Sequence, residues 1–306
     1  MGRTAFFQGS MTPIEEAKIS VMTHAFLYGT ACFEGIRAYW NSAEDELFVF
    51  RMREHYERML KSCNILRIQP MYGADELCEL TLDLLKRCGD QEDVYIRPIF
   101  YKSAETVGVK LDGLTDDFLM FSVPFGDYLD LSKGLSVKIS SWRHLDDNAI
   151  PMRAKINGAY VNAALAKSDA LMDGYDEAII LDSRGHVSEG SAANLFLVRN
   201  GCLVTPPVTS DILEGITRST IIELAREELG IDTTEREIDR TELYTCDEAF
   251  FVGTGAQVSC ITQVDQRPVG NGQIGELGTR IQKLYFDTAK GRVPKYGHWC
   301  TPVYHR

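Results

Sequence analysis

Lys155 is the residue whose type and neighbours best suit covalent chemistry. It lies in the stretch Met152–Tyr160, MRAKINGAY, among apolar and small residues that permit close approach of a flat ligand. A lysine removed from water loses its proton more easily, and the neutral amine attacks aldehydes. On these neighbours alone an ordinary surface lysine remains the commoner explanation, so the interpretation depends on other parts of the chain.

A second stretch, Asp182–Phe196, places a carboxylate before several of the smallest residues. Glu189 is followed by Gly190, Ser191 and two alanines, which suits a site where a planar molecule lies against the backbone. A carboxylate in such a place would keep the nitrogen of a heterocyclic ring protonated. A solvated hairpin glutamate is the alternative interpretation.

Two further stretches combine free backbone N–H groups with a threonine hydroxyl. Leu213–Ser219, LEGITRS, opens a predicted helix, and Gly253–Ala256, GTGA, follows a predicted strand. Helix N-termini and glycine-rich turns bind phosphate through such groups, although each is more often an ordinary cap or turn. Neither stretch matches the dinucleotide or P-loop patterns. An amine for an aldehyde, an acid for a ring nitrogen and phosphate-binding turns together indicate pyridoxal 5′-phosphate (PLP).

The elements that must position these stretches follow from hydrophobic spacing. Helices are predicted at residues 52–64, 77–88, 157–172, 217–229 and 274–290. Strands are predicted at residues 14–21, 31–39 with a bend at Gly35, 47–51, 94–101, 118–123, 135–141, 177–182, 193–199 and 249–253. Strands and helices mix without strict alternation, so we expect an α/β (α+β) fold.

A connector divides the chain into two expected domains. Residues 124–134, PFGDYLDLSKG, combine proline, two glycines and several charges. We therefore expect a first domain at residues 1–121, an interdomain loop at 122–134 and a second domain at 135–306.

Composition argues against several classes of protein. The net charge of −12 and pI of about 5.0 disfavour a nucleic-acid-binding protein, which needs a basic face. None of the eight cysteines forms a C-x-x-C pair, so no zinc or iron–sulfur site is expected, and reduced thiols in the cytoplasm are the simpler interpretation. No apolar run approaches the roughly 20 residues of a membrane span.

Taken in order, these stretches resemble the branched-chain aminotransferases, which are fold-type IV PLP enzymes. The similarity extends over nearly the whole chain, from about Ile14 to about Lys290. The matching blocks are HAFLYGTACFEGIR (24–37), REHYERM (53–59), YIRP (95–98), AKINGAY (154–160), SEGSAANLF (188–196), GITRS (215–219) and GTGA (253–256). The resemblance implies a small N-terminal and a larger C-terminal domain with PLP between them, and a cytoplasmic homodimer or higher oligomer, such as a hexamer.

The resemblance also implies an activity and the residues that bind the cofactor. The activity would be transamination of leucine, isoleucine and valine with 2-oxoglutarate, giving 2-oxo acids and L-glutamate. Lys155 would hold PLP as a Schiff base and act as the general base. Tyr160 would hydrogen-bond the ring hydroxyl and Glu189 the ring nitrogen, while Leu213 would pack on the ring. The phosphate would be bound by Arg58, Ile216, Thr217 and Thr254.

The substrate residues follow from the same resemblance. Arg97 would pair with the distal carboxylate of glutamate, and Gly255 and Ala256 would present N–H groups to the α-carboxylate. Tyr28 and Val109 would come from the second subunit of a dimer. The pocket would be lined by Phe33, Tyr95, Phe125 and Tyr128.

Three departures from the family pattern bear on the substrate. Ala192 and Ala193 stand where Gly and Glu are usual, GTGAQ replaces GTAAE, and Phe125 stands where Trp is common. These departures leave open a D-amino-acid or (R)-amine transaminase and, less favoured, an aminodeoxychorismate lyase. Outside these enzymes, a non-catalytic PLP- or phosphate-binding protein and an α/β protein without a cofactor remain as alternatives.

Overall fold

The computed structural model describes residues 2–126 and 133–305, which form two compact units. Unit 1 comprises residues 1–126, 154–158 and 287–306, and unit 2 comprises residues 127–153 and 159–286. The short segment that carries Lys155 and the C-terminal residues thus pack with the N-terminal part of the chain. The sequence prediction cuts the chain once, at residues 122–134, and therefore places the Lys155 segment and the C-terminal residues in the second domain, whereas both group with unit 1 here. The domain boundaries stay a prediction.

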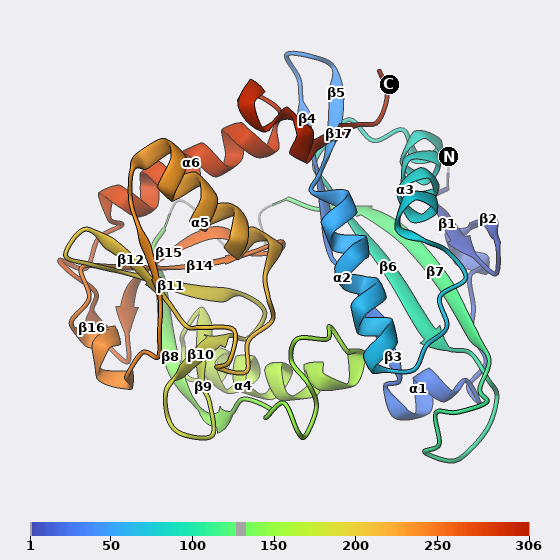
Figure 1. Cartoon of the computed structure of the whole chain (residues 1–306), viewed down its shortest axis with the longest axis horizontal. Coiled ribbons are helices and arrows are strands. Elements are labelled where there is room, and N and C mark those ends of the chain that lie inside the picture. The colour runs from blue at the N-terminus through green and yellow to red at the C-terminus, as the bar shows by residue number, and fades with distance from the viewer. Residues whose placement is uncertain (1, 127–132, 306) are drawn as a thin grey trace. The chain divides into compact units, whose positions relative to one another are not determined.

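Unit 1 is built on an eight-stranded sheet with strand order β17-β5-β4-β6-β7-β1-β2, in which β3 pairs with β6 (Figure 1). All of its strand pairs are antiparallel. The strands are β1 (Thr4–Phe7), β2 (Ser10–Pro13), β3 (Ala31–Phe33), β4 (Ile36–Asn41), β5 (Glu46–Phe50), β6 (Val94–Lys102), β7 (Asp116–Pro124) and β17 (Cys300–Pro302). The helices are α1 (His24–Tyr28), α2 (Met52–Ile65) and α3 (Ala74–Cys88), with short 3₁₀ turns at Ile14–Glu16 and Pro294–Trp299.

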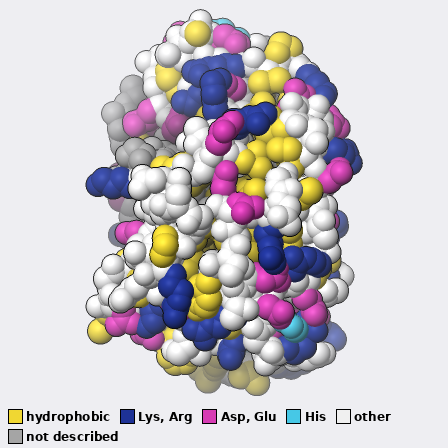
Figure 2. Space-filling model, turned by 90° about the vertical axis from the view of Figure 1, so that its left-hand side faces the viewer, with side chains coloured by type: hydrophobic (Ala, Val, Ile, Leu, Met, Phe, Trp, Pro, Cys, Tyr) yellow, Lys and Arg dark blue, Asp and Glu magenta, His cyan; other side chains and the backbone are white. Residues whose placement is uncertain are grey.

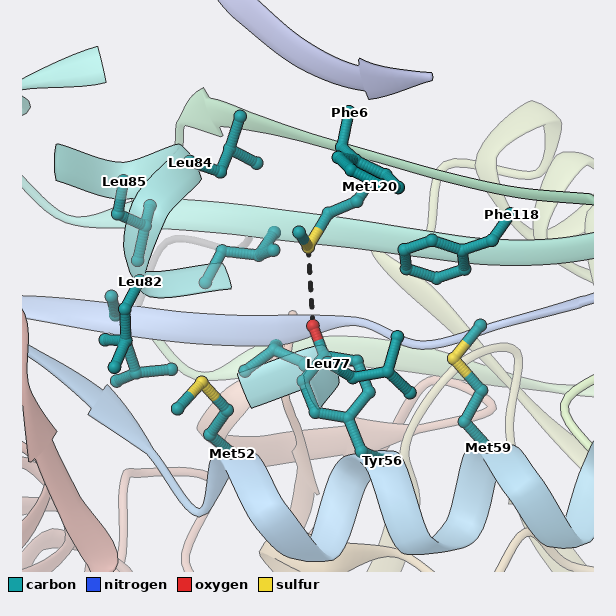
Figure 3. Close-up of a cluster of buried hydrophobic side chains, with 14 of the residues drawn as sticks. Phe6, Met52, Tyr56, Met59, Leu77, Leu82, Leu84, Leu85, Phe118 and Met120 are labelled. Carbon is teal, nitrogen blue, oxygen red and sulfur yellow. Dashed lines mark hydrogen bonds between the residues drawn. The ribbon is translucent and has the colours of Figure 1, made fainter. Parts of the chain in front are cut away.

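The apolar faces of α2 and α3 form the core of unit 1 with the sheet. Met52, Tyr56 and Met59 recur at helical spacing on α2 and are fully or almost fully buried. The Tyr56 hydroxyl donates to Met120 Sδ at 3.3 Å, as Figure 3 shows, so the ring's polar end has a partner inside the core. Truncating one of these side chains to alanine is expected to cost about 2–5 kcal/mol of stability.

Unit 2 is built on a nine-stranded sheet with order β10-β9-β8-β15-β14-β11-β12-β13, in which β16 pairs with β15 (Figure 1). The pairs β8–β9, β8–β15 and β12–β13 are parallel, and the other pairs are antiparallel. The strands are β8 (Leu135–Arg143), β9 (Glu177–Leu181), β10 (Val187–Gly190), β11 (Asn194–Arg199), β12 (Cys202–Thr205), β13 (Thr233–Glu235), β14 (Glu248–Gly253), β15 (Gln257–Val264) and β16 (Arg267–Pro268).

Helices pack on this sheet through small and branched side chains. Helix α4 (Tyr160–Met172) packs Ala166 and Ala170 on Ala178 and Ile180 of the sheet. Helix α5 (Ile216–Leu229) ends at Gly230, whose left-handed conformation closes the last turn. The remaining elements are α6 (Glu276–Ala289) and 3₁₀ turns at Asn157–Ala159 and Arg240–Tyr244. The mixed α/β class predicted from the sequence is confirmed.

The predicted elements agree with the structure, with one clear error and several omissions. The predicted strand at 14–21 is wrong, because Ile14–Glu16 forms a 3₁₀ turn and the following apolar residues stay exposed, Ile19 at 45% and Val21 at 75%. Ala17, Ile19 and Val21 alternate with Lys18 and Ser20 as in a strand. Within the described residues, however, this segment belongs to neither sheet, and an alternating pattern forms a strand only where sheet partners are present. The single predicted strand at 31–39 is two, β3 and β4, separated at Glu34–Gly35. The sequence prediction omitted α1, β1, β2, β12, β13, β15, β16 and β17.

The surface carries charges of both signs. On the face in Figure 2, Lys and Arg side chains lie among Asp and Glu side chains rather than gathering by sign. Within the described residues, no helix has both the length and the apolar character needed to span a bilayer.

Candidate active site

Lys155 is held by backbone contacts on two sides within unit 1. Its amide N–H donates to Ser62 Oγ of α2 at 3.3 Å, and its carbonyl accepts from the Phe33 N–H of β3 at 3.0 Å. The Lys155 Nζ atom lies 5.0 Å from the centroid of the Phe33 ring, and the residue is half-buried. A strand and a helix therefore fix the amine beside an aromatic face.

Two glycines allow the Lys155 segment to approach α1 closely. Gly29 ends α1 with φ of 69°, and a Cβ on it would lie 2.7 Å from Gly158 Cα. The Gly158 N–H donates to the Gly29 carbonyl at 3.2 Å. A side chain at Gly29 would push the two backbones apart, so Gly29 helps to set the position of Lys155.

Arg97, Tyr95 and Phe33 form one cluster on the unit 1 sheet. Arg97 Cζ lies 4.1 Å from the Phe33 ring centroid, and its Nε and Nη2 donate to the Tyr95 hydroxyl at 3.1 and 2.8 Å. The Phe125 ring centroid lies 5.3 Å from that of Tyr95. A Cβ on Gly35 would lie 2.3 Å from the Tyr95 hydroxyl oxygen, so only glycine leaves room for this ring. The structure brings these four residues, all predicted to bind the substrate, together in one cluster.

Arg58 is anchored by a buried carboxylate that the sequence prediction did not assign. Arg58 Nε and Nη2 donate to Glu34 Oε1 and Oε2, both at 2.8 Å, and His55 Nδ1 lies 2.8 Å from Glu34 Oε2. Glu34 is fully buried, and although burial opposes its charge, Arg58 and His55 hold its pKa well below the usual range. Burial lowers the pKa of His55, which therefore stays neutral and donates its Nδ1–H.

Tyr28 and Val109 lie close to each other on the surface of unit 1. The Tyr28 hydroxyl accepts from the Gly108 N–H at 2.9 Å, and the exposed fractions of Tyr28 and Val109 are 38% and 82%. His24 supports this arrangement, because its Nε2 lies 2.7 Å from the Gly108 carbonyl oxygen. The predicted residue Tyr128 lies outside the described residues.

Glu189 lies near the end of β10 in unit 2, where it is only 6% exposed. Its Oε2 accepts from Asn194 Nδ2 at 2.7 Å. Its Oε1 faces the Leu213 N–H at 3.4 Å and His144 Nε2 at 3.4 Å. Gly190 follows without room for a side chain, because a Cβ there would lie 2.8 Å from Phe251. The carboxylate is therefore fixed in a tightly packed place.

The start of α5 offers backbone N–H groups close to Asn194, which binds Glu189. Ile216 and Thr217 are the first two residues of the helix and are 9% and 5% exposed. Gly215 precedes them in an extended conformation, and the first turn of α5 contains no acidic residue. The positive end of the helix dipole and these N–H groups favour an anion at this end.

The turn between β14 and β15 carries Thr254, which is predicted to bind the phosphate, and Gly255 and Ala256, which are predicted to bind the substrate's α-carboxylate. In the sheet, Asn194 pairs with Val252, so the end of β14 and the following Thr254 lie next to the start of β11. The backbone around Ala192 and Ala193 touches Gly253, since the Ala192 oxygen lies 3.3 Å from an ideal Cβ there. A Cβ on Gly255 would meet no atom within 4 Å, so the turn has open space where the family pattern has alanine. The N–H of half-buried Gly255 and of buried Ala256 belong to this turn.

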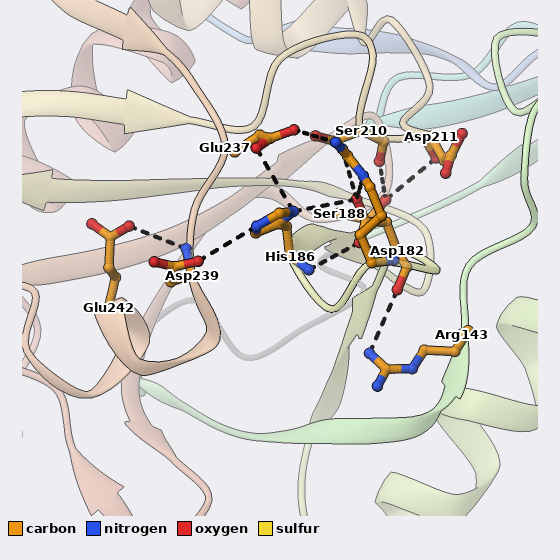
Figure 4. Close-up of polar contacts among 10 residues, drawn as sticks. Arg143, Asp182, His186, Ser188, Ser210, Asp211, Glu237, Asp239 and Glu242 are labelled. Carbon is orange, nitrogen blue, oxygen red and sulfur yellow. Dashed lines mark hydrogen bonds and ion pairs between the residues drawn. The ribbon is translucent and has the colours of Figure 1, made fainter.

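A network of polar contacts fixes the hairpin that leads to Glu189 (Figure 4). Asp182 Oδ1 accepts the N–H groups of Arg184 and His186, both at 2.9 Å, and so holds the turn at residues 182–185. Ser188 Oγ donates to the carbonyl oxygen of Ser210 at 2.7 Å. The β9–β10 hairpin is thereby tied to the segment that continues to Leu213.

The chain matches a known protein family over most of its length. The model of the amino-transferase class IV family matches residues 31–264. A probable branched-chain-amino-acid aminotransferase of Aquifex aeolicus is 50% identical over 300 residues, which are 98% of this chain and 96% of that protein. The chain belongs to the class IV aminotransferase family.

Solved structures agree with this assignment. The branched-chain aminotransferase of Thermoproteus uzoniensis, solved with norvaline, shares 41% identity and a TM-score of 0.95 over 99% of this chain and 100% of that one. The branched-chain amino acid aminotransferase of Thermobaculum terrenum in its PLP form shares 37% identity and a TM-score of 0.94, over 99% and 98% of the two chains. The predicted α/β fold of the type IV aminotransferases is confirmed.

In this class IV aminotransferase, sequence reasoning missed three buried residues that support the predicted site. Glu34 lies inside the block FEGIR, His55 inside REHYERM and Asn194 inside SEGSAANLF, so each was present in a recognised stretch without a role. The spacing of His55 and Arg58 on one helix face was an available signal. The contacts of His55 and Arg58 with Glu34 join residues 21 and 24 positions apart, and the contact of Asn194 with Glu189 depends on the turn between β10 and β11. Within the described residues, no group of three side chains suited to a metal is found.

Proposed function

We propose that this protein is a PLP-dependent aminotransferase that moves the amino group of leucine, isoleucine or valine to 2-oxoglutarate. The observation that carries the proposal is the position of the Lys155 amine. It lies 5.0 Å from the Phe33 ring, and Arg97 lies over the same ring at 4.1 Å. An amine for an aldehyde and a guanidinium for a carboxylate thus share one aromatic neighbour within unit 1.

The residues present fit PLP, group by group. The amine of Lys155 suits the aldehyde, and the buried carboxylate of Glu189 suits a protonated ring nitrogen. Tyr160 opens α4 and is proposed to hydrogen-bond the ring hydroxyl, and Leu213 is proposed to pack on the ring. For the phosphate we propose Arg58, Ile216, Thr217 and Thr254, which supply a guanidinium, the start of a helix and a turn.

The bound cofactor supplies an aldehyde and a ring that withdraws electrons from the substrate. Lys155 Nζ would take the proton from the substrate Cα as the general base and would give it back as the general acid. Glu189 would keep the proton on the ring nitrogen by offering an anionic oxygen. Asn194 and the other buried neighbours of Glu189 exclude water from that carboxylate.

The substrate residues explain how one site accepts an apolar and an acidic side chain. Phe33, Tyr95 and Phe125 present aromatic surface that favours branched aliphatic side chains. Arg97 is proposed to bind the distal carboxylate of glutamate, because its planar fork matches a carboxylate. The N–H groups of Gly255 and Ala256 are proposed to bind the α-carboxylate.

We further propose a cytoplasmic homodimer in which Tyr28 and Val109 contact the second copy. Support comes from an exposed apolar surface around α1 and the 107–109 loop, defined by Val21, Phe26, Val107 and Val109 with exposed fractions of 66–82%. All eight cysteines are free, as suits a reducing compartment.

Reduction with borohydride followed by peptide mapping tests the anchor of the cofactor. The label is expected on Lys155, and Lys155→Ala is expected to abolish transamination while the protein stays folded. Lys167→Ala, which removes a lysine bound to Glu177 instead, serves as the control and keeps its activity. Label on another lysine, or full activity of Lys155→Ala, would refute the proposal.

A panel of amino donors tests the substrate class. L-Leucine, L-isoleucine and L-valine are expected to react with 2-oxoglutarate faster than D-alanine or (R)-1-phenylethylamine. A preference for either of the latter two would replace the branched-chain assignment by one of the related transaminases. Release of pyruvate from aminodeoxychorismate would indicate the lyase.

A further inference from the structure

Asn194 contacts three of the segments that the proposed function assigns to the cofactor. It is the first residue of β11 and is 5% exposed. Its Nδ2 donates to Glu189 Oε2 at 2.7 Å and to the Leu213 carbonyl at 2.9 Å. Its Oδ1 lies 2.0 Å from the place that a Cβ on Gly215 would occupy. One amide side chain therefore lies among the ring-nitrogen carboxylate, the ring-packing residue and the start of α5.

The orientation of this amide is fixed by its partners. A carboxylate oxygen and a carbonyl oxygen only accept hydrogen bonds, so both must face the NH₂ end of Asn194. The two hydrogens of Nδ2 are then used, one by Glu189 and one by Leu213. The ladder pairing of Asn194 with Val252 holds its backbone, which leaves the side chain little freedom.

A second set of hydrogen bonds joins the β10 segment to the segment before Leu213. Ser188 Oγ, one residue before Glu189, donates to the carbonyl oxygens of Ser210 at 2.7 Å and Asp211 at 3.3 Å (Figure 4). Ser188 thus fixes the backbone beside Glu189, and Asn194 fixes its carboxylate. Because Ser188 maintains the backbone tie independently, loss of the Asn194 donor is expected to alter the carboxylate more than the fold.

We propose that Asn194 is a positioning residue that orients the Glu189 carboxylate toward the PLP ring nitrogen and holds Leu213 and α5 beside it. This inference rests on the proposed function, because it assumes that Glu189 meets that nitrogen. Removing the Asn194 donor leaves the charge on Oε2 less well solvated, and the carboxylate is then held only through Oε1, which faces the Leu213 N–H and His144 Nε2 at 3.4 Å. The proton on the ring nitrogen then loses part of its stabilisation, as second-sphere partners elsewhere tune a bound group.

The direct test is the Asn194→Ala variant of the full-length holoenzyme reconstituted with ¹⁵N-labelled PLP. The ring ¹⁵N resonance is expected to shift toward that of the unprotonated ring, and PLP binding to the apoprotein should weaken by about tenfold. Thr205→Val is the matched control, since Thr205 is fully buried in the same sheet and donates to the Leu195 carbonyl at 2.7 Å. It should lower the melting temperature without moving the ¹⁵N resonance.

Gly215 provides a steric test of the same contact. Gly215→Ala places a methyl group against Asn194 Oδ1, so PLP binding should weaken although every hydrogen-bonding side chain is retained. In the double variant Gly215→Ala with Asn194→Ala, the blocking amide is gone. The double variant should therefore bind PLP no more weakly than Asn194→Ala alone, whereas independent effects would add.

The outcomes separate this inference from the proposed function. If the wild-type protein fails to bind PLP, the proposed function fails and the inference with it. If wild type binds PLP and Asn194→Ala loses only thermal stability, with the ¹⁵N resonance and PLP affinity unchanged, the positioning role alone is overturned. Should Asn194→Ala not fold, Asn194→Leu fills the volume without the donor and is expected to give the same shift. An unshifted resonance in that variant would equally overturn the role.

Discussion

Tyr95 illustrates how much of the proposed substrate selection depends on one hydroxyl group. This hydroxyl accepts both Nε and Nη2 of Arg97, at 3.1 and 2.8 Å, and it faces the Cα of Gly35, where any side chain would collide with it. The guanidinium is therefore aimed by its neighbours in the sheet. The role proposed for Arg97 in binding acidic substrates should depend on this orientation as well as on its charge.

Tyr95→Phe is expected to weaken the binding of acidic substrates more than that of aliphatic ones. Without the hydroxyl, Arg97 loses two hydrogen bonds but keeps its stacking on Phe33. We expect KM for 2-oxoglutarate to rise about tenfold, and KM for the 2-oxo acid of leucine to change by less than about twofold. Steady-state kinetics with both acceptors measures this, and an equal rise for both would show that Arg97 does not depend on Tyr95 for acidic substrates.

At the scale of elements, α2 connects the core of unit 1 to the Lys155 segment. One face of the helix buries Met52, Tyr56 and Met59, and another presents His55, Arg58 and Ser62. Ser62 accepts the Lys155 N–H, and His55 and Arg58 surround Glu34. A shift of α2 would thus move several proposed site residues together.

His55 should make unit 1 sensitive to mild acid. Burial lowers the pKa of His55 below its ordinary value of 6.5, so the unfolded chain binds the proton first as pH falls. Stability should be complete above pH 6.5 and decline below it, before the carboxylates titrate. In His55→Gln, whose amide still donates to Glu34, the decline in melting temperature between pH 6.5 and 5 should be smaller. Identical pH profiles for wild type and variant would contradict this.

A carboxylate in β5 fixes the residues that follow β17. Glu46 accepts the N–H groups of Leu47, Val303, Tyr304 and His305 at 2.8–3.0 Å. Although burial opposes the charge, these donors lower the pKa of Glu46. This contribution to stability is present above the ordinary value of 4.5 and is lost as pH falls through the folded-state value.

Glu46→Ala should therefore loosen the C-terminal residues. The three N–H groups that follow β17 lose their acceptor, and we expect a loss of about 2–4 kcal/mol in urea denaturation. Amide hydrogen exchange should rise at residues 303–305. Glu16→Ala, at an exposed glutamate of the first 3₁₀ turn, is the control and should change little. Unchanged exchange at 303–305 would show that Glu46 does not hold the tail.

For the whole molecule, the exposed apolar surface around α1 and the 107–109 loop bears on assembly. Val109 is 82% exposed, and Tyr28 is bound to the same loop through the Gly108 N–H. Apolar side chains gathered on one surface favour burial against a partner. The proposed homodimer would cover them with a second copy of the chain.

Val109→Asp should shift the protein toward monomers and reduce its activity. A charge buried at an interface without a partner is strongly unfavourable. Light scattering after gel filtration measures the mass, and assays at matched concentrations measure activity. Lys86→Asp, a charge change at an exposed residue of α3, should leave both unchanged. A Val109→Asp protein with the mass and activity of the wild type would contradict a role for this surface.

Sequence alone singled out Lys155, Glu189 and the turns beside Thr217 and Thr254 as candidates, because their chemistry is local. An amine among small residues, an acid before glycine and N–H groups at a helix start are each readable over a few positions. Helices with clear apolar periodicity, such as α2 and α5, were also readable. The strands at both ends of the chain were not, because β1, β2 and β17 are only three or four residues long and depend on their sheet partners.

Only the tertiary structure decided which buried residues support the site. Glu34 meets Arg58 across 24 residues, Asn194 meets Leu213 across 19, and the Lys155 segment packs with a unit whose main part ends at residue 126. Such pairings arise from strand register and helix packing, which no local pattern encodes. The Glu34 carboxylate and the Asn194 amide each need partners once they are removed from water, and only the folded chain shows where those partners are.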